Sequence, residues 1–329
     1  MRSQKRAEKS KKTKIILSII TILVMLVITG VAYAYIKLGD VKKVPISKSD
    51  EKLHVSKDVK KYKDNDEIVN IAFFGLDRRS KDEPSRSDAI MVVSFDKKHK
   101  KIKLSSIMRD SYVDIEGHDK TKLNHAYAYG GPELAIKTIN SNYNMNIRDF
   151  VAVDFFELEK IIDNVGGVEI PVRTDEINHI NNGMKEVARI QGASIEQVDS
   201  PGLQTLNGKQ AVAYARIRHT AGGDFERTDR QRTVLNAILE KVKKQGASKF
   251  PGIVSSILPN LTTSLSSTEI LKMGASGFAL GIDNVEQQRF PLDKYCKGTS
   301  IGGIYYLQYD KEQTISQMHK YIYEDIKPN

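Results

Sequence analysis

The sequence predicts a single α/β domain in which helices flank a mixed central β-sheet, with one transmembrane helix before it. Three observations lead to this prediction: short apolar runs of strand length, amphipathic segments between them, and one long uncharged stretch near the amino terminus. Strands and helices alternate through one continuous region without a break, which is typical of a sheet covered by helices. The 329 residues, 40% of them hydrophobic, suffice for a large buried core.

The first 36 residues predict a basic cytoplasmic head followed by a membrane anchor. Residues 1–14 hold seven basic side chains and one acid, so six of the ten net positive charges lie there. Residues 15–36 are uncharged, and a helix of this length spans about 33 Å, enough to cross a hydrocarbon core of roughly 30 Å. Basic residues before such a helix keep that end in the cytoplasm. A cleaved signal peptide is the alternative, because residues 32–34 resemble a cleavage site.

Residues 37–67 predict an extracytoplasmic linker, and residues 68–329 predict the folded domain. The linker is polar, rich in lysine and weakly patterned. The expected localisation is therefore the cell membrane, crossed once, with the domain outside. The only cysteine, Cys296, excludes an internal disulfide framework and a cysteine-based zinc site. Because the excess charge lies on the head and not on the domain, no nucleic-acid partner is expected.

Five short apolar runs predict the strands. Each is bounded by charged or turn-forming residues and is rich in β-branched or aromatic side chains, which is typical of buried strands. They cover Ile68–Gly75, Ala89–Phe95, Ile102–Met108, Val151–Phe155 and Val168–Val172.

Five segments predict helices. Pro132 suits the first turn of one of them, Ser267 opens a capping signature, and apolar positions recur at helical spacing after Arg227. The predicted helices cover residues 132–140, 157–164, 227–245, a segment beginning at 267, and 310–326. Residues 173–204 show little pattern and predict an irregular excursion over the surface.

Two acids flank the loop between the first two predicted strands. Asp77 follows the first strand and Asp88 precedes the second. If these strands are neighbours, both carboxylates converge at one sheet edge and can hold a hard cation, for which Mg²⁺ with substrate phosphates fits best. An ordinary surface loop explains the same two acids.

The segment from Tyr214 to Arg232 concentrates five arginines among three acids. Arginine presents a planar fork of donors that matches phosphate oxygens. If residues 214–218 are extended, Arg216 and Arg218 share one face, and Gly222 and Gly223 let the chain turn back. A following helix would begin beside these arginines and favour an anion at its amino end. A salt-bridged surface is the alternative explanation.

Through these motifs and others, the sequence resembles the LytR–CpsA–Psr family, whose members attach anionic glycopolymers to bacterial cell walls. Eight blocks in order carry the resemblance: Gly75–Asp77, Arg86–Asp88, Met108–Asp110, Lys122–Gly131, Val165–Gly167, Leu206–Ala211, Ala215–Arg218 and Gly223–Gln231. Two departures are mild, since Met108 stands where proline is common and Glu226 where glycine is frequent.

The resemblance implies a role for each motif residue. Asp77 and Asp88 are expected to bind Mg²⁺, Asp224 to orient a diphosphate clamp, and Lys122 to line it. The side chains expected to clamp a polyprenyl diphosphate are Arg86, Arg109, Arg216, Arg218, Arg227 and Gln231. Four residues are expected to be catalytic: Arg86, Asp88, Arg109 and Arg218. An apolar pocket for the lipid is also implied, but six apolar residues near it are interpreted as ordinary core: Phe150, Val153, Phe155, Phe156, Ile161 and Ile162.

The reaction that the resemblance implies moves a glycopolymer, such as wall teichoic acid or capsule, from a polyprenyl-diphosphate carrier to peptidoglycan. The acceptor is the 6-hydroxyl of a muramic acid residue. The general base stays open, because Asp88 as a metal ligand would be a poor base. The alternatives are a hydrolase of the same lipid diphosphates and a non-enzymatic lipid-binding or regulatory surface protein.

Overall fold

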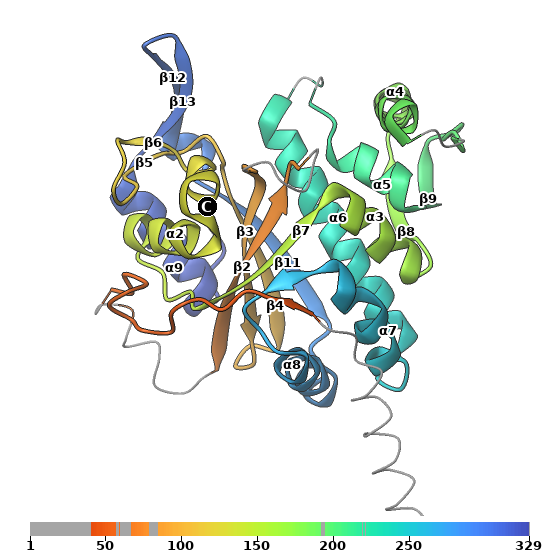
Figure 1. Cartoon of the computed structure of the whole chain (residues 1–329), viewed down its shortest axis with the longest axis horizontal. Helices are drawn as coiled ribbons and strands as arrows, with labels where there is room; N and C mark the ends of the chain where they lie inside the picture. Colours follow the sequence, from red (N-terminus) through yellow and green to blue (C-terminus); the bar gives the residue numbers. More distant parts are fainter. Residues whose placement is uncertain are drawn as a thin grey trace, which may run out of the picture. The chain divides into compact units, whose positions relative to one another are not determined.

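A seven-stranded mixed β-sheet forms the centre of the protein (Figure 1). The computed structural model describes residues 41–56, 59, 67–78, 85–191, 195–218, 220 and 222–328, with the backbone alone for 186–191. Asp40–Asn329 forms one unit, separate from Met1–Gly39. The predicted head and anchor lie outside the described residues, within which no helix has the length and apolar character to cross a membrane.

The strands of this sheet pair in both directions. Their spatial order is β1 (Lys42–Lys43), β10 (Thr262–Thr263), β7 (Asp149–Asp154), β2 (Ile68–Leu76), β3 (Ser87–Asp96), β4 (Lys101–Ile107) and β11 (Asn284–Phe290). The central strands β2, β3 and β4 are antiparallel to one another, whereas β7 joins β2 and β11 joins β4 in parallel. Nine of the ten residues of β3 are buried, which explains its nearly continuous apolar run.

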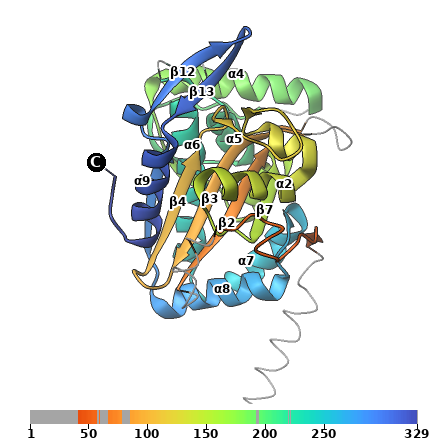
Figure 2. The same ribbon diagram turned by 90° about the vertical axis from the view of Figure 1, so that its left-hand side faces the viewer.

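Helices cover both faces of the sheet (Figures 1 and 2). On one face lie α2 (His125–Tyr143) and α9 (Lys311–Tyr323), and on the other α3 (Phe155–Asn164), α5 (Gly208–Ala215) and α6 (Gly223–Gln245). The remaining helices are α4 (Thr174–Gln191), α7 (Phe250–Ile257), η2 (Leu258–Asn260), α8 (Ser267–Leu280) and η3 (Asp293–Tyr295).

Three two-stranded sheets stand outside the central one. They pair β5 (Tyr112–Val113) with β6 (Thr121–Lys122), β8 (Val168–Val172) with β9 (Gly202–Leu206), and β12 (Cys296–Ile301) with β13 (Ile304–Tyr309). The predicted α/β fold with a mixed, helix-flanked sheet is confirmed. The strand predicted at Val168–Val172 is also present, although it belongs to one of these small sheets.

The predicted 132–140 helix is longer than expected and contains a break. α2 starts at His125, but Gly130 and Gly131 leave helical geometry, and Gly131 has a φ of 64°. Glycine adopts this backbone at little cost. Pro132 therefore opens the second half of α2, as the sequence suggests.

Three local predictions were wrong. Part of the predicted linker, residues 41–56, belongs to the folded unit, because β1 pairs with β10 in the central sheet and Leu53 and Val55 are buried in the hydrophobic core. Residues 173–204 are not an irregular excursion, because they contain α4 and β9. Residues 214–218 are not extended: Tyr214 and Ala215 end α5, and Arg216 is its C-cap. α5 forms there because Asn207 and Gln210 make a reciprocal capping box at its start.

Candidate active site

The predicted pair of acids lies where β2 and β3 meet at one sheet edge. Leu76 pairs with Ser87 across a local irregularity, and the Asp77 N–H then donates to the Arg86 carbonyl at 3.2 Å. Asp88 is the second residue of β3, so β3 starts earlier than the sequence predicted. This pairing brings the chain of both acids to the same edge of the sheet.

Asp88 is the centre of an arginine cluster drawn from distant segments. Its Oδ1 accepts from Arg109 Nη1 at 2.6 Å and its Oδ2 from Arg218 Nη2 at 2.6 Å. Arg227 Nη1 lies 3.9 Å from Oδ2. Asp88 is only 6% exposed, so these charge-assisted contacts are strong. Three of the predicted clamp arginines therefore converge on one carboxylate.

Asp224 ties the same arginines to the first turn of α6. Its Oδ1 lies 2.8 Å from Arg227 Nη2 and 3.3 Å from Arg109 Nη2. Its Oδ2 is buried and has no hydrogen-bond partner among the described residues. A carboxylate in this position orients two guanidinium groups and leaves one oxygen available for a further donor.

Several cationic donors of this cluster have no hydrogen-bond partner among the described residues. Arg227 is 2% exposed, and its Nε and Nη1 lack hydrogen-bond partners within the described part of the chain, as does Arg109 Nε. Burial lowers the pKa of Arg227 to about 10. Buried unsatisfied donors are costly, so an anion with several oxygens would relieve this cost.

Arg109 stays a cation despite its burial. Burial alone would lower the pKa of its guanidinium, but the carboxylates of Asp88, Asp224 and Asp110 raise it above the usual value. The cluster can therefore present a permanent positive charge to a phosphate.

Lys122 and Asp110 extend the cluster on its other side. Lys122 Nζ lies 2.8 Å from Asp110 Oδ1, and Asp110 Oδ2 lies 3.7 Å from Arg109 Nε. Asp110 was not among the residues predicted from the sequence to take part in the site, although its position next to Arg109 was the available signal. Lys122 also lies 5.9 Å from the ring centres of Tyr305 and Tyr306 in β13, which no motif indicated.

Within the described part of the chain, two predicted clamp arginines, Arg86 and Arg216, make no hydrogen bond or ion pair with Asp88. Arg216 is the C-cap of α5, not part of an extended segment, and places its guanidinium 4.7 Å from the centre of the Phe155 ring. Arg86 is exposed just before β3. Its charge still reaches this region, since burial and then Arg86 lower the pKa of His125.

An apolar cavity opens between the sheet and the helices next to the cluster. Its sheet side includes Ala89, which follows Asp88, and its helix side includes Gln231, one turn beyond Arg227. The other lining residues are Phe73, Gly75, Met91, Val153, Asp154, Phe155, Leu158, Ala215, Val234, Leu235 and Ile238. Gln231 is thus a polar side chain in an otherwise largely apolar wall.

Of the six residues interpreted as core, Phe156 is half-buried, and the other five divide between this cavity and the packed interior. Val153 and Phe155 line the cavity. Phe150 and Ile162 are fully buried members of two separate hydrophobic clusters, and Ile161 is 4% exposed. The core interpretation therefore holds for these three, whereas Val153 and Phe155 line a cavity of about 40 Å³.

Asp77 and Asp88, at the same sheet edge, are the residues that could hold a magnesium ion, because their carboxylates are hard oxygen ligands beside cations suited to phosphate. Asp224 adds no third ligand, because no group of three described metal-ligand side chains within reach of one ion includes Asp77, Asp88 or Asp224. Both oxygens of Asp88 currently accept from arginines, so these contacts would be shared or exchanged when an ion and a diphosphate bind.

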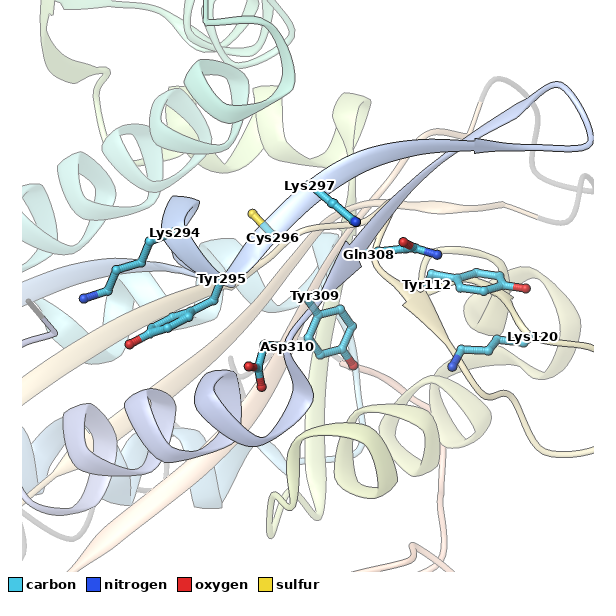
Figure 3. A pocket seen from close by; sticks show the side chains of 9 residues that line it. All are labelled: Tyr112, Lys120, Lys294, Tyr295, Cys296, Lys297, Gln308, Tyr309 and Asp310. Carbon is cyan, nitrogen blue, oxygen red and sulfur yellow. The ribbon is translucent and has the colours of Figure 1, made fainter.

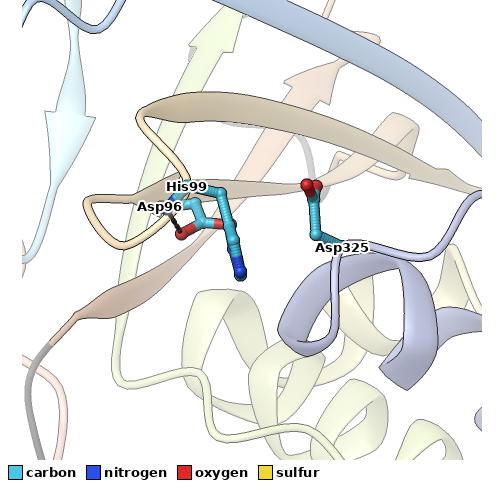
Figure 4. Close-up of side chains that lie close together, drawn as sticks. All are labelled: Asp96, His99 and Asp325. Atoms are coloured by element: carbon cyan, nitrogen blue, oxygen red, sulfur yellow. Dashed lines mark hydrogen bonds and ion pairs between the residues drawn. The ribbon is translucent and has the colours of Figure 1, made fainter.

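A second group of metal-ligand type, Asp96, His99 and Asp325, lies elsewhere (Figure 4). Lys103 Nζ lies 2.8 Å from Asp96 and 3.0 Å from Asp325. An ammonium group therefore takes the place that a cation would need, and this group holds the carboxyl-terminal segment against the turn between β3 and β4.

A family model and two known proteins are similar to this chain over most of its length. The family model described as the LytR_cpsA_psr family matches residues 32–322. The "Polyisoprenyl-teichoic acid--peptidoglycan teichoic acid transferase TagT" of Bacillus subtilis is 29% identical over 337 residues, covering 99% of this chain and 98% of that protein. The "Regulatory protein MsrR" of Staphylococcus aureus is 34% identical over 229 residues, covering 69% of this chain and 66% of that protein.

The chain is also similar in three-dimensional structure to a solved protein. It is described as "LytR-CPS2A-psr family protein YwtF (TagT) with bound octaprenyl pyrophosphate lipid", with a TM-score of 0.58 and 26% identity over 79% of this chain and 91% of that one. Because the family model spans most of the sequence and the fold agrees, the chain belongs to the LytR_cpsA_psr family.

Proposed function

We propose that this protein transfers an anionic glycopolymer from a polyprenyl-diphosphate carrier to peptidoglycan. The observation that carries the proposal is the buried arginine cluster with unpartnered donors beside an apolar cavity. A polyprenyl diphosphate has the matching parts, a doubly charged head and a hydrocarbon tail. TagT, which is named a teichoic acid transferase, and the TagT structure with octaprenyl pyrophosphate support the same substrate class.

The chemistry is a phosphoryl transfer. The acceptor, a muramic acid 6-hydroxyl, attacks the phosphorus that carries the glycan. The bond from that phosphorus to the bridging oxygen breaks, polyprenyl phosphate leaves, and the hydroxyl proton passes to a base. Arg109, Arg218 and Arg227 would neutralise charge on the transferring and leaving phosphates, where this reaction chiefly needs help.

Magnesium is part of the proposal. Asp77 and Asp88 would hold the ion, which when bound would withdraw charge from the diphosphate oxygens. The chain's own residues supply the rest: Asp224 orients two guanidinium groups, and Lys122 lines the edge of the site. Chelation of divalent cations should abolish turnover, and Mg²⁺ should restore it. Full turnover in the presence of a chelator would contradict the metal assignment.

The amino-terminal segment is proposed to anchor the domain in the cytoplasmic membrane, with the catalytic domain outside the cell. Residues 15–36 are the anchor, and this position would hold the site beside the leaflet that presents the lipid carrier. Protease added to intact, wall-stripped cells should digest the domain. Protection of the domain from that protease would contradict this topology.

Arg218→Ala tests the site. Arg218 is 48% exposed at its side chain and contacts Asp88, so its loss should leave the fold intact and lower turnover about 10²–10³-fold, as for other removed charge-stabilising donors. The substrates are a synthetic polyprenyl-diphosphate glycan and peptidoglycan. Arg148→Ala is the control, since Arg148 is 23% exposed at its side chain and pairs with Asp50, outside the cluster; it should keep full turnover.

Product analysis separates the transferase from a hydrolase. A transferase should release polyprenyl phosphate only when peptidoglycan is present, whereas a hydrolase would release it with water as acceptor. Full activity of the Arg218→Ala protein would count against the site in either case.

A regulatory role is the second candidate, because MsrR is named a regulatory protein. If the protein only binds lipid and acts as a regulator, the wild type and the Arg218→Ala variant should have the same effect in cells, provided that the variant still binds lipid. Loss of the cellular effect together with turnover would favour the transferase.

A further inference from the structure

A polar groove lies at the base of the β12–β13 hairpin (Figure 3). We call it the lysine–tyrosine groove, after six of its lining residues: Tyr112, Lys120, Lys294, Tyr295, Lys297 and Tyr309. Its volume is about 510 Å³. In Figure 3, Lys294 and Lys120 lie toward opposite ends, with Lys297 between them. The cations are therefore spread along an elongated surface.

The charge of the groove is poorly compensated by the protein. Lys294 and Lys297 make no ion pair with any described residue, and Lys120 lies 3.8 Å from Asp114, whose side chain is 75% exposed. Asp310 is the one acid in the lining. Its carboxylate accepts from Gln313 N at 3.0 Å as the N-cap of α9, and the helix terminus offsets its charge.

Aromatic contacts connect the groove to the arginine cluster. The rings of Tyr112 and Tyr306 are 4.7 Å apart between centroids, and Lys122 lies 5.9 Å from the Tyr306 ring. Lys122 in turn lies 2.8 Å from Asp110 in the cluster. One layer of side chains, Lys122, Tyr306 and Tyr112, therefore separates the cluster from the groove, which puts both within reach of one extended polymer.

We propose that the lysine–tyrosine groove binds the phosphodiester-linked glycopolymer of the donor as it leaves the active site. This inference rests on the proposed function. Lysines spaced along a groove suit a linear polymer with one negative charge per repeat, and tyrosine rings pack against the carbon faces of sugars and polyols. The acceptor fits less well, since the glycan strands of peptidoglycan carry little charge and their peptide carboxylates are partly balanced by amines.

The test uses the full-length protein and a soluble oligo(glycerol phosphate) as probe. One variant replaces the groove cations: Lys120→Gln, Lys294→Gln and Lys297→Gln. Its control carries the same charge change at exposed lysines elsewhere: Lys52→Gln, Lys272→Gln and Lys320→Gln. Calorimetry should show that the groove variant binds the probe about tenfold more weakly than the control, as loss of three exposed ion pairs implies. Binding to the control should weaken as salt rises.

Two further measurements separate this inference from the proposed function. The wild type and both variants should turn over a donor with only a short neutral glycan at equal rates. If the wild type does not use this donor, the proposed function is wrong. That outcome would leave the binding of the probe unchanged. Equal probe binding by the groove and control variants would overturn the inference. Weaker binding of a soluble peptidoglycan fragment by the groove variant, with probe binding unchanged, would overturn it in favour of an acceptor groove.

Discussion

Arg227 shows at the scale of a single residue how a binding site can cost stability. It is 2% exposed and two of its three nitrogens lack hydrogen-bond partners in the described structure. Burial lowers the pKa of its guanidinium to about 10. Because the pKa of this cation is depressed by folding, its charged form is penalised at neutral pH, and the penalty fades only as the pH rises through about 10. The position of Arg227 therefore favours ligand binding at the expense of the stability of the ligand-free protein.

Arg227→Met should therefore separate function from stability. We expect turnover to fall about 100-fold or more, because a donor to the transferring phosphate is lost. The free energy of unfolding without ligand should stay within about 1 kcal/mol or rise, in contrast to most buried substitutions. Denaturant unfolding and a turnover assay measure the two effects.

Arg232→Met is the matched control. Arg232 also lies on α6, is 7% exposed, has two unpartnered nitrogens and has a pKa lowered by burial. It takes no part in the contacts with Asp88, so its replacement should preserve turnover. If Arg232→Met lowers turnover as much as Arg227→Met does, the cause is a disturbance of α6 and not the loss of the Arg227 donor.

At the scale of elements, the packing of α5 on α3 positions Arg216 and Arg218. Gly208 starts α5, and a Cβ there would lie 2.2 Å from the Glu159 carbonyl oxygen of α3. The Gly208 N–H donates to Asp163 Oδ1 at 2.7 Å. Because the opposing atom is backbone, the two helices must separate to admit any side chain. The arginines that follow α5 would move with it.

Gly208→Ala should lower the free energy of unfolding by about 1–3 kcal/mol, the usual cost of overpacking. It should also lower turnover, although Gly208 contacts no residue of the arginine cluster. Gly252→Ala in α7 is the control, since a Cβ at that position would meet no atom within 4 Å. That change should leave stability unchanged or raise it by about 0.5–1 kcal/mol. Denaturant unfolding of both variants checks the pair, and equal effects would refute the packing argument.

At the scale of the whole molecule, a buried charge network attaches the carboxyl terminus to the central sheet. The side chains of Asp96 and Lys103 are both 0% exposed. Lys103 Nζ also reaches Asp325 at 3.0 Å and donates to the Ile322 carbonyl at 3.1 Å. Figure 4 shows Asp325 facing Asp96 and His99 across this junction. These contacts join strands β3 and β4 to the segment that follows α9.

The network should make stability sensitive to acid. Burial by itself raises the pKa of Asp96, but hydrogen bonds from Lys103 and His99 outweigh it and hold the pKa below the usual value; Lys101 and Lys103 do the same for Asp325. Carboxylates with a depressed pKa in the folded state contribute stability above their unfolded pKa of about 4. That contribution is lost as the pH falls through their folded pKa values.

Lys103→Met should lower the free energy of unfolding at pH 7 by about 3–5 kcal/mol, because it leaves a buried carboxylate without its partner. The loss of stability between about pH 4 and pH 2 should become shallower in the variant. Lys272→Met, at an exposed position of α8, should change neither quantity. An unchanged acid profile for Lys103→Met would show that the network is not the source of the acid sensitivity.

Much of the fold was predictable from local patterns. The apolar runs at Ile68–Leu76 and Ser87–Asp96 specify buried strands wherever they pair. The short connection between them makes antiparallel pairing the natural outcome, which brings Asp77 and Asp88 to one edge. Arg227 and Gln231 share a helix face by their spacing alone. The carboxylate–arginine motif was therefore visible in the sequence.

Tertiary structure decided what depends on distant partners. β11 is a polar segment that becomes a strand because β4, far away in the sequence, pairs with it in parallel. Arg216 contacts Phe155 whereas Arg218 contacts Asp88, and the β12–β13 hairpin reaches Lys122 from a region without motifs. A periodic pattern reports the solvent and the core on each side of one segment, so the sequence by itself determined the buried strands, several helices and the residue types that the chemistry requires. Which side chains meet is set by contacts between segments, and only the folded chain contains that information.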